Sequence, residues 1–118
     1  MKVSHFTILL NSHQPDVLRD FYRDVVGLET DEQVGGFKVG GAHMLIDGHS
    51  DVSAGNQQPA RVLINLFVDD IAAEQARLEN QGVKFIRSLG REFWGGVIST
   101  FLDPDGNYAQ LIEFKPEP

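Results

Sequence analysis

Two histidines, His5 and His43, are the side chains of this sequence best suited to chemistry near neutral pH. Both fall in segments of strand-forming residues, whereas His13 and His49 fall in predicted loops, where we interpret them as surface side chains. Imidazole titrates near neutrality and is a common metal ligand. We therefore consider metal binding at both positions, or general-base catalysis at His5. The chain has no cysteine, which excludes thiolate metal sites, disulfides and a cysteine nucleophile.

Three further polar side chains lie among apolar residues in predicted strands. Side chains alternate between the two faces of a strand, so Asn65 shares a face with Leu63 and Phe67, while Tyr108 shares one with Gln110. A buried amide needs a hydrogen-bond partner, which a ligand or water can supply. Apolar and aromatic walls with a few polar groups are typical of small-molecule pockets. The aromatic walls that we expect include Phe93 and Trp94, although Trp94 could equally be a core side chain.

These residues lie on a pattern of strands and helices that occurs twice. In the first half, an apolar strand over 3–10 precedes an amphipathic helix over 15–26, which Gly27 ends, and three short strands follow over 28–47. In the second half, a strand over 61–68 precedes a helix over 71–81 that Asp69 or Asp70 caps. Strands over 83–86, 95–102 and 108–114 complete it, with a turn at 103–107.

The repeat predicts the domain organisation. Each half reads β-α-β-β-β, and the pattern restarts after about sixty residues, which is half of the chain. We expect one α+β domain with a first module over about 1–48, a linker over about 49–60 and a second module over about 61–118. The linker is rich in turn-forming residues.

Composition excludes several classes of function. The 118 residues carry 10 Lys and Arg against 17 Asp and Glu, a net charge of −7. Binding to nucleic acid or to anionic membranes depends on clustered basic residues, so we expect neither. No apolar run approaches the length of a membrane span, and charges within residues 1–30 do not fit a signal peptide, so we expect a cytoplasmic protein. Nucleophile-elbow, phosphate-loop and dinucleotide motifs are missing from the sequence.

The sequence resembles the vicinal oxygen chelate superfamily, the group of glyoxalases, bleomycin resistance proteins and extradiol dioxygenases. The resemblance extends over nearly the whole chain. It implies two paired βαβββ modules whose sheets form an open barrel around a ligand cavity, usually closed by dimerisation. The segments that carry it are the His5 strand, Phe21–Glu29 (FYRDVVGLE), Phe67–Ile71 (FVDDI), Gly82-Val83, Trp94-Gly95 and Phe101–Asn107 (FLDPDGN).

The resemblance also implies where metal ligands would lie. His5 matches the first ligand, but the second position holds Leu63, and the final position, usually Glu, holds Gln110. The remaining ligand would come from residues 42–47, where His43, Leu45 and Asp47 share a face, while Glu113 points to the face opposite Gln110. We therefore favour no metal cofactor. The alternative is a divalent metal held by His5, His43 and Gln110.

The leading hypothesis is a metal-free, bleomycin-resistance-like protein that sequesters a hydrophobic or amphipathic small molecule, as a homodimer. The alternative is a lyase, isomerase or dioxygenase in which His5 is a metal ligand or a general base. A third possibility is a structural or regulatory module whose cavity is filled by side chains. The ligand-binding residues that we expect are His5, Thr7, Asn65, Phe67, Trp94, Tyr108 and Gln110.

Overall fold

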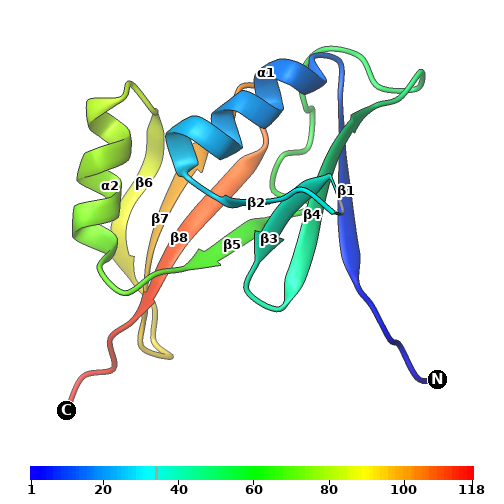
Figure 1. The fold of residues 1–118 in the computed structure, drawn as a ribbon. Coiled ribbons are helices and arrows are strands. Elements are labelled where there is room, and N and C mark those ends of the chain that lie inside the picture. The colour runs from blue at the N-terminus through cyan, green and yellow to red at the C-terminus, as the bar shows by residue number, and fades with distance from the viewer. Residues whose placement is uncertain (34) are drawn as a thin grey trace. The chain divides into compact units, whose positions relative to one another are not determined.

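The chain divides into two compact units in the computed structural model, which describes residues 1–33 and 35–118 (Figure 1). Unit 1 comprises Met1–Ala54 and unit 2 comprises Gly55–Pro118. The boundary between them falls inside the segment 49–60 that the sequence predicts as a linker. Each unit has the order β-α-β-β-β, and each forms its own four-stranded mixed sheet. The predicted α+β class and the two βαβββ modules are therefore confirmed.

Unit 1 forms a sheet in which only one pair of strands is parallel. The strands lie in the order β1-β4-β3-β2, and β1 runs parallel to β4 while the other neighbours are antiparallel. The helical segment, α1 continued by the π-helix η1, ends at Gly27, which has a φ of +88° as expected of a helix stop. The elements are β1 (Thr7–Ser12), α1 (Pro15–Asp20), η1 (Phe21–Val26), β2 (Glu29–Asp31), β3 (Gly36–Val39) and β4 (Ala42–Gly48).

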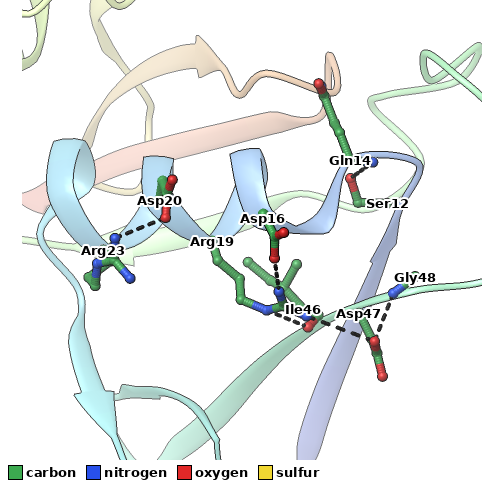
Figure 2. A network of polar contacts seen from close by, with 9 residues as sticks. All are labelled: Ser12, Gln14, Asp16, Arg19, Asp20, Arg23, Ile46, Asp47 and Gly48. Atoms are coloured by element: carbon green, nitrogen blue, oxygen red, sulfur yellow. Dashed lines mark hydrogen bonds and ion pairs between the residues drawn. The ribbon is translucent and has the colours of Figure 1, made fainter.

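Helix α1 contacts β1 and β4, and its apolar side chains Leu18 and Tyr22 are fully buried. Arg19 links the helix to β4 by a hydrogen bond, in which its Nε donates to the Ile46 carbonyl at 3.1 Å (Figure 2). The same guanidinium donates to Asp16 at 2.7 Å, one turn earlier on the helix. These bonds hold α1 on one face of the unit 1 sheet.

A second arginine of this helical segment shifts the pKa of its neighbour Asp24. Arg23 pairs with Asp20 at 2.9 Å (Figure 2). It also donates to Asp24 at 2.8 Å. The hydrogen bond from Arg23 lowers the pKa of the Asp24 carboxyl. Both residues are exposed, so this pair orders the surface of the helix and plays no part in the core.

Unit 2 repeats the plan, with β6 and β7 longer than the corresponding strands β2 and β3 of unit 1. Its sheet has the order β5-β8-β7-β6, with β5 parallel to β8 and the other neighbours antiparallel. Asp70 caps α2 as predicted, accepting a bond from the Ala73 amide at 3.1 Å. The elements are β5 (Ile64–Phe67), α2 (Ile71–Asn80), β6 (Phe85–Arg91), β7 (Gly96–Leu102) and β8 (Tyr108–Phe114).

Helix α2 covers one face of the unit 2 sheet through apolar and polar contacts. Ile71 and Leu78 of the helix are buried. Gln75 is also buried; its amide nitrogen donates to Ser88 of β6 at 2.8 Å and its oxygen accepts from Ser99 of β7. The hydrogen bonds satisfy a polar side chain that would otherwise destabilise the core. They also identify the face of the sheet that α2 covers.

Three predicted strand boundaries are wrong. Residues 3–6 lie before β1 because β4 begins only at Ala42, so they have no strand to pair with. The strand predicted over 61–68 is confined to Ile64–Phe67, the residues that pair with β8. The strand predicted over 83–86 runs instead from Phe85 to Arg91, because pairing with β7 continues to Arg91. Tertiary pairing therefore sets these boundaries, over the local pattern.

Candidate ligand-binding face

The strands of unit 2 place a row of polar side chains on the face of the sheet away from α2, here called the open face. Ser99, Leu111 and Leu66 lie on the α2 side, so their neighbours along each strand point the other way. The strand register then sets four polar side chains side by side across all four strands. In order from β5 to β6 they are Asn65, Gln110, Thr100 and Arg87.

Two members of this polar row are hydrogen-bonded to each other. The Gln110 amide nitrogen donates to the Thr100 hydroxyl at 2.9 Å, and Thr100 is buried. The bond fixes the orientation of the Gln110 amide, whose oxygen remains an acceptor. Asn65 is exposed, and its side chain makes no hydrogen bond to the described part of the chain. The row can therefore offer both donors and acceptors to a bound molecule.

An apolar row runs beside the polar one. Phe67 pairs with Ile112 and Ile112 with Ile98, which pairs with Gly90. The two isoleucines are buried, whereas the side chain of Phe67 is 67% exposed on the edge strand β5. Exposed aromatic side chains are common at sites where proteins bind other molecules. The open face thus has buried isoleucines in its centre and an exposed phenylalanine on the edge strand β5.

Trp94 lies on the open face beyond the apolar row, with its indole ring over Gly96. A Cβ at Gly96 would come within 2.0 Å of the indole, so only glycine leaves room for the ring to lie flat on β7. The side chains of Trp94 and Phe114 are 42% and 60% exposed. A cleft of about 480 Å³ opens beside them. It is lined by Arg91, Glu92, Phe93, Trp94, Gly95, Pro116 and Glu117.

Arg87 belongs to the polar row, and sequence reasoning missed it. Its guanidinium pairs with Glu92 at 2.9 Å and lies over Gly90, where a Cβ would come within 2.3 Å of Nε. The predicted strand ended at Ile86, so Arg87 lay outside it and was assigned to neither face of the sheet. A longer strand would have included Arg87, but its place opposite Thr100 depends on the register shift between Phe85 and Arg87.

Tyr108 lies at the opposite end of the open face from Trp94. It pairs with Leu102 of β7 and lines a second cleft of about 430 Å³. The other residues around this cleft are Gln58, Pro59, Ala60 and Arg61. Unit 2 therefore holds five of the predicted site residues on one face, which are Asn65, Phe67, Trp94, Tyr108 and Gln110.

Unit 1 holds the other predicted site residues, His5, Thr7 and His43. His5 is exposed and lies before β1, where its ring stacks on His43 with centroids 5.2 Å apart. His43 Nε2 lies 3.0 Å from an Asp31 oxygen, and its Nδ1 is buried without a hydrogen-bond partner in the described chain. Thr7 pairs with His43 across β1 and β4. The register thus selects His43, among residues 42–47, as the neighbour of His5.

The comparisons with known proteins agree with this architecture. The family model of the Glyoxalase/Bleomycin resistance protein/Dioxygenase superfamily matches residues 2–111. The chain belongs to this superfamily. The resemblance predicted from the sequence is therefore confirmed. A search of functionally curated proteins found no match.

Several solved structures share the fold. A protein from the mobile metagenome of V. pseudocholerae has a TM-score of 0.74 at 22% identity, covering 98% of each chain. A superfamily member from Sphaerobacter thermophilus DSM 20745 has a TM-score of 0.72 at 21% identity, covering 96% of this chain and 98% of that one. TioX from Micromonospora sp. ML1 has a TM-score of 0.72 at 18% identity, covering 95% and 99%. At these identities the likeness concerns the fold.

The residues present do not fit the divalent metal that the superfamily often uses. Leu63, at the second ligand position, has no donor atom. The Gln110 amide is uncharged and already bonded to Thr100, and a neutral amide oxygen is a weaker ligand than a carboxylate. Glu113 faces α2 and accepts a bond from the Ile71 amide at 2.9 Å. Among the residues that the structure describes, no three His, Asp or Glu side chains group as a metal site would require.

The structure also bears on the remaining histidines and on membranes. His13 and His49 are exposed, as predicted. His49 Nδ1 accepts a bond from the Asp51 amide at 3.0 Å, which is a local turn contact. No helix in the described part of the chain is long and apolar enough to cross a bilayer.

Proposed function

We propose that this superfamily member is a bleomycin-resistance-like protein that binds and sequesters a hydrophobic or amphipathic small molecule without a metal. The observation that carries the proposal is the open face of unit 2. Exposed Phe67, Trp94 and Phe114 share the open face with an uncharged polar pair, Gln110 and Thr100, and Gln110 holds the position where a metal-dependent relative would need a carboxylate. Aromatic walls around a few oriented polar groups suit an organic ligand.

Five residues of unit 2 make up the site of this proposal. Phe67 and Trp94 supply apolar contact area, and Asn65, Tyr108 and Gln110 supply hydrogen bonds. The other two predicted ligand contacts, His5 and Thr7, belong to unit 1. We expect no cofactor to take part.

An uncharged probe tests this proposal. We expect N-phenyl-1-naphthylamine, whose fluorescence rises in apolar sites, to bind saturably. Phe67→Ala should weaken that binding about tenfold, because an exposed aromatic that becomes covered contributes roughly 1–2 kcal/mol. Val17→Ala is the matched control, since Val17 is also an exposed apolar side chain but lies on α1. Calorimetric titration with Mn²⁺, Fe²⁺, Ni²⁺ and Zn²⁺ should show no stoichiometric binding.

Two results would contradict the proposal. One is the absence of saturable probe binding to the wild-type protein. The other is micromolar or tighter binding of one of these metals that His5→Ala abolishes, which would reinstate the metal-dependent reading.

A second candidate function, catalysis by a lyase, isomerase or dioxygenase, is favoured by the cluster in unit 1. The Asp31 carboxylate is placed to accept the Nε2 proton of His43, which would leave Nδ1 as the basic nitrogen of the neutral ring. His5, stacked on that ring, is exposed and able to meet a substrate. On this candidate function, we expect turnover of hemithioacetals or catechols that His5→Ala abolishes. No turnover across such a panel would reject this candidate.

We also propose that the protein is a homodimer. Unit 1 exposes the apolar side chains Phe6, Ile8 and Leu9 at or next to the edge strand β1. A second copy could cover this apolar surface. Sedimentation velocity should give twice the chain mass of 13.1 kDa, and a monomer at that mass would contradict the proposal.

A further inference from the structure

Arg87 introduces the only basic side chain of the polar row on the open face. Within the four strands of unit 2, which the structure describes in full, Glu113 is the only carboxylate, and it faces α2. The strand positions of the open face therefore hold one guanidinium and several neutral donors, and the carboxylate of Glu92, which directly follows β6, pairs with that guanidinium. Such a face suits a ligand rich in acceptor oxygens.

Resting on the proposed function, we propose that the ligand of this face carries an anionic group, a carboxylate or sulfonate, and that Arg87 binds that group and selects for it. The apolar body of the ligand would lie against the exposed aromatic side chains Phe67 and Trp94. The anionic oxygens would then reach the guanidinium at the β6 edge of the sheet.

The placement of the guanidinium supports this role. Most surface arginines extend into solvent, but Arg87 lies across Gly90, on the sheet itself. A side chain at position 90 would occupy the same space, since its Cβ would come within 2.3–2.7 Å of three guanidinium atoms. Glycine at this position thus allows the charge to lie next to Ile98, the residue that pairs with Gly90. The side chain of Arg87 is 39% exposed, so a ligand can reach it.

The guanidinium has donors left for a ligand. It carries five N–H groups, and its one partner in the described chain is Glu92, at 2.9 Å from Nη2. Glu92 holds the side chain in place while the site is empty and competes with an incoming anion. Removing the Glu92 charge should therefore strengthen anion binding, whereas removing Arg87 should weaken it.

A matched pair of probes tests the proposal. 8-Anilinonaphthalene-1-sulfonate and N-phenyl-1-naphthylamine share one aromatic body, but only the first carries a charge. We expect Arg87→Gln to weaken sulfonate binding about tenfold and to leave binding of the neutral probe within about twofold. Arg87→Lys should retain part of the preference, and Glu92→Gln should tighten sulfonate binding. Arg77→Gln is the control, because Arg77 lies on α2 and pairs there with Glu74.

The outcomes separate this inference from the proposed function. If the neutral probe binds and Arg87→Gln changes both affinities equally, or neither, the inference is wrong and the proposed function stands. If neither probe binds the wild-type protein, both are wrong. Far-ultraviolet circular dichroism of each variant verifies the fold, and the opposite effects expected of Arg87→Gln and Glu92→Gln do not arise from simple destabilisation.

Discussion

Replacing Phe101 with alanine is expected to lower the free energy of unfolding by about 3–5 kcal/mol. Phe101 of β7 is fully buried, and its ring packs on Phe85 of β6 with centroids 5.4 Å apart. The substitution removes buried apolar surface and leaves a cavity that the surrounding sheet and α2 can fill only in part. Urea denaturation followed by circular dichroism measures the change.

Phe93→Ala is the matched control for this prediction. Its side chain is 99% exposed, so we expect a change within about 0.5 kcal/mol. Similar losses of stability in the two variants would contradict the assignment of Phe101 to the core of unit 2. A large loss for Phe101 alone would support it.

Replacing Asp103 with alanine is expected to cost about 2–4 kcal/mol. Asp103 is buried in the turn between β7 and β8, and its carboxylate accepts three hydrogen bonds. They come from the Asp105 amide at 2.9 Å, the Asn107 amide at 3.0 Å and the Asn107 side chain at 2.9 Å. Alanine would leave these donors without their partner in a turn that water reaches poorly.

Two further variants make the Asp103 prediction specific. Asp103→Asn keeps one acceptor oxygen, so it should retain the two backbone bonds and lose less stability than Asp103→Ala. Asp51→Ala is the control, because the Asp51 side chain is 87% exposed. Equal losses for the asparagine and alanine variants would show that the negative charge matters more than the hydrogen-bond geometry.

The turn at Asp103 also bears on the proposed binding face. It connects β7 to β8, and the register that follows pairs Leu102 with Tyr108 and Thr100 with Gln110. A slip of one residue would turn Gln110 to the α2 side, because side chains alternate along a strand. We therefore expect Asp103→Ala to weaken probe binding as well as the fold.

Local signals in the sequence determined much of the fold. Residues close together in the sequence predict three features that the structure shows. They are the repeat of strand, helix and three strands, the helix cap at Asp70 and the end of the first helical segment at Gly27. The strand Tyr108–Phe114 has the predicted bounds because alternating residues follow a strong turn signal. The superfamily follows from the same motifs.

Tertiary structure alone decided which side chains meet. The pairing of β6 with β7 contains two register shifts that simple alternation does not predict, and the sequence pattern ended β6 too early and missed Arg87. The alignment of Asn65, Gln110, Thr100 and Arg87 depends on three separate strand registers. Likewise, the parallel pairing of β1 with β4 brings His43 beside Thr7, and His5 stacks on it from outside the strand. Register is a property of paired strands, and no single strand encodes its partner's position.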